Sequence, residues 1–218
     1  MYRRNQGLTA EKTASYFLMD KEFVVEESVL ENHRKYLERI GIFKDAGCDM
    51  EFERDALLEQ ASPVSGSILE VGTGKGHFAI ALAKKGYSLT SVDLSEEEQK
   101  YAKLNAAYFH LLDHIDFQIA DAEHLPFEDQ SFDMVFSVNA IHHFFHPYKA
   151  VDEMIRVMKT TGKLVISDFS REGFDLVSKI HQQEGREHQK GEAAVNDLCG
   201  YIAGKGLVLQ KHRTIFQE

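Results

Sequence analysis

The 218-residue sequence predicts an α/β fold, in which helices cover both faces of a doubly wound, mostly parallel sheet. Two observations predict it. After residue 66, short β-rich runs alternate with helical runs, and a glycine-rich loop follows the first of the β-rich runs. Such alternation is typical of parallel strands joined by crossover helices, because each helix returns the chain to the same end of the sheet.

The segment that precedes the sheet has a different pattern. Apolar side chains between about residues 8 and 61 recur at helical steps, and a Ser-Pro-Val-Ser-Gly stretch at 62–66 ends this part. We therefore expect two regions, a helical one over residues 1–62 and the sheet domain over residues 63–218. The aromatic and thioether side chains of the helical region are Tyr16, Phe17, Met19 and Phe23.

Five runs rich in β-branched and aromatic residues predict the strands. They are residues 67–71, 88–93, 115–119, 132–138 and 163–167. The helix after the second strand starts at Ser95 with Glu98 three positions later, the pattern of a reciprocal capping box. The helix after the fourth strand carries Val151, Met154, Ile155 and Met158 on one face.

Composition excludes several classes of protein. Thirty-five acidic against 25 basic residues give a formal net charge of −10, so we expect no nucleic-acid partner. No apolar run is long enough to span a bilayer and no signal core follows the first residues, so we expect no membrane partner and a cytoplasmic location. The only two cysteines, Cys48 and Cys199, form no CxxC pair, which favours a reducing compartment.

The loop after the first predicted strand reads Glu-Val-Gly-Thr-Gly-Lys-Gly-His over residues 70–77. Glycine at alternate positions allows a sharp turn and lets a ligand lie against the main chain. A dinucleotide fingerprint would need glycine at position 77, where this chain has His77. The loop thus predicts a bound ligand and argues against a nicotinamide oxidoreductase, which stays as a rival interpretation.

Glu70, Gly72, Gly74 and Gly76 resemble motif I of the class I S-adenosylmethionine-dependent methyltransferases, of the small-molecule type found in ubiquinone and menaquinone biosynthesis. Further landmarks follow in order at 93, 121–122, 132–143 and 156–162, so the resemblance covers about half of the chain, residues 67–168. It implies a Rossmann-like sheet, S-adenosylmethionine as cofactor and in-line displacement of its methyl group toward a small-molecule acceptor. It also implies that the region over residues 1–62 closes over the site as a lid, although the aromatic side chains there are equally typical of a helix core.

The resemblance assigns roles to individual residues. Asp93 would hold the ribose diol, since a carboxylate accepts hydrogen bonds from both hydroxyls, and Asp121 and Ala122 would flank the adenine. Each aspartate could instead cap a helix or a turn. The complete set of cofactor-binding candidates is Glu70, Gly72, Thr73, Gly74, Gly76, Asp93, Leu94, Asp121, Ala122 and Asn139.

Histidines supply the catalytic candidates, His142, His143, His181 and His188. His142 and His143 follow the fourth strand, where an imidazole could accept a proton from the acceptor. His181, Glu184 and His188 would share one face of a helix. With His142 they could form an acid–base pocket or bind a divalent metal, but the same run also reads as a solvated helix end, and we predict no metal.

Two questions stay open in the sequence. The last twelve residues contain no turn signal and barely allow two strands, so either the sheet edge is minimal, or the tail is truncated, or a second copy covers the edge as a homodimer. The identity of the acceptor is not determined, and a His-rich metal-binding acceptor site or a non-catalytic S-adenosylmethionine-binding protein are the alternatives.

Overall fold

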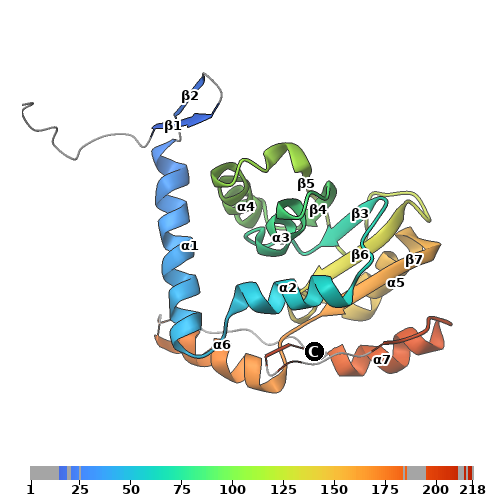
Figure 1. Cartoon of the computed structure of the whole chain (residues 1–218). Coiled ribbons are helices and arrows are strands. Elements are labelled where there is room, and N and C mark those ends of the chain that lie inside the picture. The colour runs from blue at the N-terminus through green and yellow to red at the C-terminus, as the bar shows by residue number, and fades with distance from the viewer. Residues whose placement is uncertain are drawn as a thin grey trace, which may run out of the picture.

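The computed structural model describes residues 15–18, 21–24, 26–183, 185, 195–210, 214 and 216–217. Its centre is a five-stranded sheet in the order β5-β4-β3-β6-β7 (Figure 1). These strands are Ile115–Ile119, Leu89–Asp93, Ile68–Val71, Phe132–Val138 and Met158–Ser167, respectively. All neighbours are parallel. The predicted doubly wound sheet is thus confirmed, and the chain changes direction across it at β3.

Helices cover both faces of the sheet. One face packs against α2 (Met50–Gln60), α3 (His77–Lys84) and α4 (Glu96–Tyr108). The other packs against α5 (Pro147–Val157) and α7 (Val195–Gly204), and Figure 1 shows the sheet between α2 and α5. Successive strand residues alternate between the two cores, since Ile68 belongs to the first and Leu69 to the second. Two 3₁₀ turns, η1 (Leu112–His114) and η2 (Ile141–His143), and α6 (Arg171–Gln183) complete the domain.

The predicted strands agree with the observed ones except at β7. The run over residues 163–167 is only its second half, because the strand already begins at Met158. Met158 was expected to continue the preceding helix, and that expectation is wrong. Its backbone pairs with Phe132, and the carbonyl of Val157 accepts from the N–H of Ser131. The backbone therefore changes from helical hydrogen bonds to sheet hydrogen bonds directly at the end of α5.

The N-terminal region is less helical than its periodicity predicts. Helix α1 starts only at Glu27 and runs to Asp45, and the described residues before it form an antiparallel pair, β1 (Ser15–Leu18) and β2 (Lys21–Val24). The expectation of a helix there is therefore wrong. Aromatic residues favour paired strands, and Tyr16 lies opposite Phe23 in this pair. Met19 lies outside the described residues.

Helix α1 is attached to the sheet domain through α4. The ring of His33 stacks on Tyr108 with centroids 3.4 Å apart, and Asn32 Nδ2 donates to Asn105 Oδ1 at 2.7 Å. At its other end, Phe43 packs with Val177 of α6. In Figure 1, α1 accordingly stands beside α4 and reaches down to α6.

The described C-terminal residues add no strand to the sheet. Beyond α7 the structure records one isolated bridge, between Phe169 and Gln217, so β7 is the edge strand within the described part of the chain. Part of this tail lies outside the described residues, so the minimal edge, the truncated tail and the homodimer all stay predictions. None of the described helices combines the length and apolar character that a bilayer crossing requires.

One arginine attaches α5 to the segment after β5. Arg156 Nε and Nη2 donate to both carboxylate oxygens of Glu153, at 2.7 and 2.8 Å. Its guanidinium also donates to Asp129 Oδ1 and to the carbonyls of Leu125 and Phe127, at 2.8 to 2.9 Å. The segment over residues 125–129 is therefore held by hydrogen bonds to one charged side chain.

We expect Arg156→Met to lower the free energy of unfolding by about 2 to 4 kcal/mol, because it leaves two carbonyls and two carboxylates without their charged donor. Urea denaturation measures the change. Lys103→Met, on the exposed face of α4, is the matched control and should change stability by less than about 0.5 kcal/mol. An Arg156→Met variant as stable as this control would contradict the assignment.

Candidate active site

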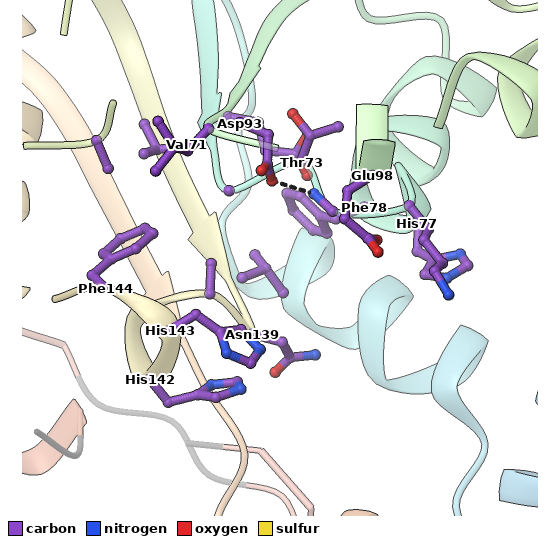
Figure 2. A pocket seen from close by; sticks show the side chains of 18 of the residues that line it. Val71, Thr73, His77, Phe78, Asp93, Glu98, Asn139, His142, His143 and Phe144 are labelled. Atoms are coloured by element: carbon purple, nitrogen blue, oxygen red, sulfur yellow. Dashed lines mark hydrogen bonds between the residues drawn. The ribbon is translucent and has the colours of Figure 1, made fainter. Parts of the chain in front are cut away.

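A cavity of about 840 Å³ opens at the carboxyl ends of β3, β4 and β6, the edge at which parallel α/β sheets bind ligands (Figure 2). A cavity of this size holds a ligand of drug size and has room for a second small molecule. Its wall includes the predicted loop residues and also side chains of α1, α2 and α6. Predicted site residues in the wall are Glu70, Gly72, Thr73, Gly74, Asp93, Leu94, Asp121, Ala122, Asn139, His142, His143 and His181.

The glycine loop approaches its neighbours more closely than a side chain would permit. A Cβ on Gly72 would lie 2.3 Å from the Cβ of Ala140 in the loop after β6. A Cβ on Gly76, which has φ +77° at the start of α3, would lie 2.9 Å from the Cβ of Ala102 in α4. Gly76 is not in the cavity wall, so its role in this structure is the packing of α3 against α4.

Asp93 holds the glycine loop and the start of α4 together. Its Oδ2 accepts the N–H of Gly74 at 2.7 Å, the dashed contact in Figure 2, and its Oδ1 accepts the N–H of Ser95 at 2.8 Å. Ser95 Oγ accepts from the N–H of Glu98 at 3.1 Å, which is one of the two hydrogen bonds of the predicted capping box. In the other one, the N–H of Ser95 donates to Asp93 and not to the Glu98 side chain. Each carboxylate oxygen has a second lone pair for a ligand hydroxyl.

Glu70 lies under the loop and is 1% exposed. Ser91 Oγ donates to Glu70 Oε2 and is itself 2.6 Å from Thr73 Oγ1. The pKa of Glu70 is raised to about 8, mainly by burial and also by the negative charge of Asp93, while the hydrogen bond from Ser91 acts in the opposite direction. Glu70 is therefore largely protonated at neutral pH. The side chains under the loop, Glu70, Ser91 and Thr73, are thus polar but uncharged.

The remaining cofactor candidates lie on the loops after β5 and β6. Asp121 Oδ1 accepts the N–H of Glu123 at 2.8 Å, which lowers the pKa of the carboxyl and shows that it caps a turn. Asn139 has φ +54°, an uncommon conformation for a residue other than glycine. Its Oδ1 is buried with no hydrogen-bond partner in the described residues, so an acceptor in the cavity wall is available to a ligand donor.

Histidines gather at the other end of the cavity. The rings of His142 and His143 lie side by side, with centroids 3.9 Å apart, and extend toward Asn139 in Figure 2. The pKa of His143 is lowered to about 4, mainly by desolvation and also by the neighbouring His142. His181 Nε2 is 2.9 Å from Arg39 Nη2. The structure thus brings together three of the four predicted catalytic histidines.

Two members of the predicted histidine cluster, Glu184 and His188, lie outside the described residues. In the described part of the chain, no group of three or more His, Cys, Asp or Glu side chains is arranged to hold a metal ion. The expectation of no metal therefore stays a prediction, and the set of His142, His181, Glu184 and His188 stays its alternative.

Sequence reasoning missed several residues of the wall and one residue outside it. Asp168, which directly follows β7, accepts a hydrogen bond from His142. The sequence did contain a signal for this residue. Asp168 comes directly after the fifth predicted strand, which lies beside the strand that precedes His142 and His143. Tyr36, Arg39 and Arg54 come from α1 and α2. The periodicity of those helices predicts an apolar face but not which polar residues border the cavity.

Comparison with known proteins identifies the sheet domain. Residues 69–166 match the family described as "Methyltransferase domain". A ubiquinone/menaquinone biosynthesis C-methyltransferase, UbiE, of Rickettsia massiliae is 36% identical over 124 residues, which cover 54% of this chain and 50% of that protein. The chain spans about half the length of the curated relatives that it matches.

Solved structures agree with this at the level of the fold. The YcgJ protein of Bacillus subtilis is 25% identical, with a TM-score of 0.55, over 70% of this chain and 67% of that one. An S-adenosylmethionine-dependent methyltransferase of Aquifex aeolicus is 20% identical, with a TM-score of 0.58, over 75% and 85% of the two chains. At that identity the second likeness supports the fold alone.

The raised pKa of Glu70 predicts a pH-dependent stability. An unfolded glutamate ionises near pH 4.5, whereas the folded one keeps its proton to about pH 8. Raising the pH between these values therefore favours the unfolded chain. Glu70→Gln cannot ionise, so we expect its unfolding free energy to rise relative to the wild type by on the order of 3 kcal/mol between about pH 5 and pH 8.

Urea denaturation at several pH values measures this difference. The same change at the exposed Glu97 is the control and should leave the pH dependence unaltered. A constant gap between Glu70→Gln and the wild type across this range would show that Glu70 is ionised in the folded protein.

Proposed function

Residues 69–166 form a methyltransferase domain of the class I, S-adenosylmethionine-dependent family, and we propose that the chain transfers the methyl group of this cofactor to a small-molecule acceptor. The observation that carries the proposal is one continuous cavity with two chemically different ends. One end has the glycine loop and Asp93, the other has the histidines and the apolar side chains of α1 and α6, and Asn139 lies beside His143 (Figure 2).

Asn139, Asp93 and the glycine loop fit the cofactor. The buried Oδ1 of Asn139 lacks a donor among the described residues and matches the ammonium group of the cofactor. Asp93 has lone pairs left for the ribose hydroxyls, and the absence of a Cβ at Gly72 keeps the strand end open. A carboxylate-bearing end also suits a ligand that carries positive charge on sulfur.

The cofactor, when bound, supplies an activated methyl group on a sulfonium. The contribution of the chain is to align the acceptor with that methyl group and to exclude water, effects worth up to roughly 7 to 11 kcal/mol when the alignment is good. The two groups of wall residues lie at the same sheet edge, which supports a meeting of the two molecules at the carboxyl ends of β3 and β6.

The acceptor end favours a flat, largely apolar molecule. Its wall includes Ile40, Phe43, Met50, Phe169 and Val177, which offer apolar surface on several sides. The relative from Rickettsia is named for C-methylation in ubiquinone and menaquinone biosynthesis. A quinol-type aromatic ring is therefore the acceptor that we propose.

The region over residues 1–62 has a role in this proposal. Tyr36, Arg39 and Ile40 of α1 and Met50 and Arg54 of α2 form the cavity wall opposite the sheet edge. This arrangement supports a substrate-binding and covering function for the two helices. The sheet domain over residues 63–218 would then hold the cofactor.

The direct test combines binding and turnover. We expect calorimetry to show binding of S-adenosylmethionine and S-adenosylhomocysteine but not of NAD. Incubation with S-adenosylmethionine and a panel of quinols, phenols, thiols and amines should release S-adenosylhomocysteine. Binding without product from any acceptor would leave a non-catalytic S-adenosylmethionine-binding protein, and absence of binding would reject the proposal.

Asp93→Asn should weaken cofactor binding by about 1 to 3 kcal/mol, because it replaces a charged acceptor by an amide that can accept at only one oxygen. Calorimetry with S-adenosylhomocysteine measures the loss. Asp116→Asn, an exposed acid on the adjacent strand β5, is the control. Equal affinity of both variants would remove Asp93 from the cofactor site.

A further inference from the structure

A buried histidine–aspartate pair lies at the acceptor end of the cavity. His142 belongs to η2 after β6, and Asp168 directly follows β7, the neighbouring strand. His142 Nδ1 is 2.7 and 2.8 Å from the two carboxylate oxygens of Asp168. His142 is only 4% exposed and Asp168 only 3%. Adjacent parallel strands thus bring together two side chains that are 26 positions apart in the sequence.

The carboxylate of Asp168 determines which ring nitrogen can act as a base. It also accepts the backbone N–H groups of His142 and Phe169, at 3.1 and 2.8 Å. Because an ionised carboxylate only accepts hydrogen bonds, Nδ1 of His142 carries the proton. In the neutral ring, Nε2 then holds the lone pair that can take up a proton.

Within the described residues, no lysine or arginine forms an ion pair with Asp168. Its negative charge is therefore placed to stabilise an imidazolium on His142. Burying such a pair is costly compared with apolar packing, so the presence of His142 in the wall of the cavity, with Asp168 against it, indicates a functional use.

Among the described residues, the other titratable groups near this pair come from η2, α6 and α1. His143 of η2 is neutral above about pH 4. His181 of α6 accepts at Nε2 from the Arg39 guanidinium of α1, which can only donate, so that nitrogen carries no proton. The rings of Phe169 and Phe174, 5.9 and 5.1 Å from His142, add apolar surface around the pair.

We infer that His142, oriented by Asp168, is the base that removes a proton from a phenolic hydroxyl group of the acceptor. This inference rests on the proposed methyl transfer and assigns to it a catalytic residue. An acceptor with a free lone pair, such as a thioether or a tertiary amine, would need no base. Asp168 is a positioning residue, because it acts through His142.

The step balances in atoms and electrons. The O–H proton passes to His142 Nε2 and leaves the electron pair on the acceptor. That pair, at oxygen or at the ring carbon next to it, forms the new bond to the methyl carbon as the carbon–sulfur bond breaks and its electrons go to sulfur. If the ring carbon attacks, its own proton then moves to the oxygen and restores the aromatic ring.

The test compares two phenols with S-adenosylmethionine, one weakly acidic and one nitrophenol that is already ionised at neutral pH. His142→Gln should reduce kcat/KM by about 10²- to 10⁴-fold for the weakly acidic phenol and by less than about tenfold for the nitrophenol. Asp168→Asn should show the same pattern with a smaller loss. Affinity for S-adenosylhomocysteine should stay unchanged, since neither side chain is assigned to the cofactor.

The matched control is His124→Gln. His124 also lies beside an aspartate, with its Nδ1 3.5 Å from Asp121 Oδ2, but its side chain is 69% exposed and outside the cavity wall. It should retain wild-type turnover of both phenols. An equal loss of turnover for the two phenols in His142→Gln would assign His142 a structural role and overturn the inference.

The wild-type protein provides a test that needs no variant. With the weakly acidic phenol, the rate should stay high well below the phenol's own pKa of about 10. A rate that instead rises about tenfold per pH unit up to that pKa would mean that the ionised phenol reacts without a base, against the inference. Turnover of amines or thiols but of no phenol would also overturn it while leaving the proposed methyl transfer intact.

Discussion

The site depends on the close approach of the glycine loop to the segments on either side of it. Asp93 joins the N–H of Gly74 to the N–H of Ser95, and charge-assisted hydrogen bonds of this kind contribute about 1.5 to 3 kcal/mol each. Gly72 meets Ala140 at a distance that only glycine permits. The loop is therefore fixed between β4 and the loop after β6, and the cavity takes its shape from that position.

Desolvation at this sheet edge keeps several titratable groups uncharged. It raises the pKa of Glu70 to about 8, lowers the pKa of His77 well below the usual range and lowers that of His143 to about 4. The directions differ because burial disfavours whichever form is charged. Asp93 and Asp168 each hold their carboxylate oxygens in hydrogen bonds, one beside the glycine loop and the other against His142.

Much of the fold could be predicted because its local signals agree. The strands 115–119 and 132–138 have the predicted limits, and the helix start at Ser95 is capped as expected on one side. Predictions failed where a segment with helical spacing of its apolar residues pairs with another segment as a strand. Met158 joins β7, and residues 15–18 and 21–24 pair as strands, because a neighbouring segment satisfies the backbone hydrogen bonds that a helix would otherwise use.

The sequence by itself determined the glycine loop, the acid at the end of β4 and the histidine pair after β6, since each is a local feature that follows a recognisable strand. Tertiary structure alone decided the rest. It placed Asp168 against His142, Ala140 against Gly72, and Arg39 against His181. Such partners depend on strand order and on the helix face turned inward, and these are set by packing between segments that are distant in the chain.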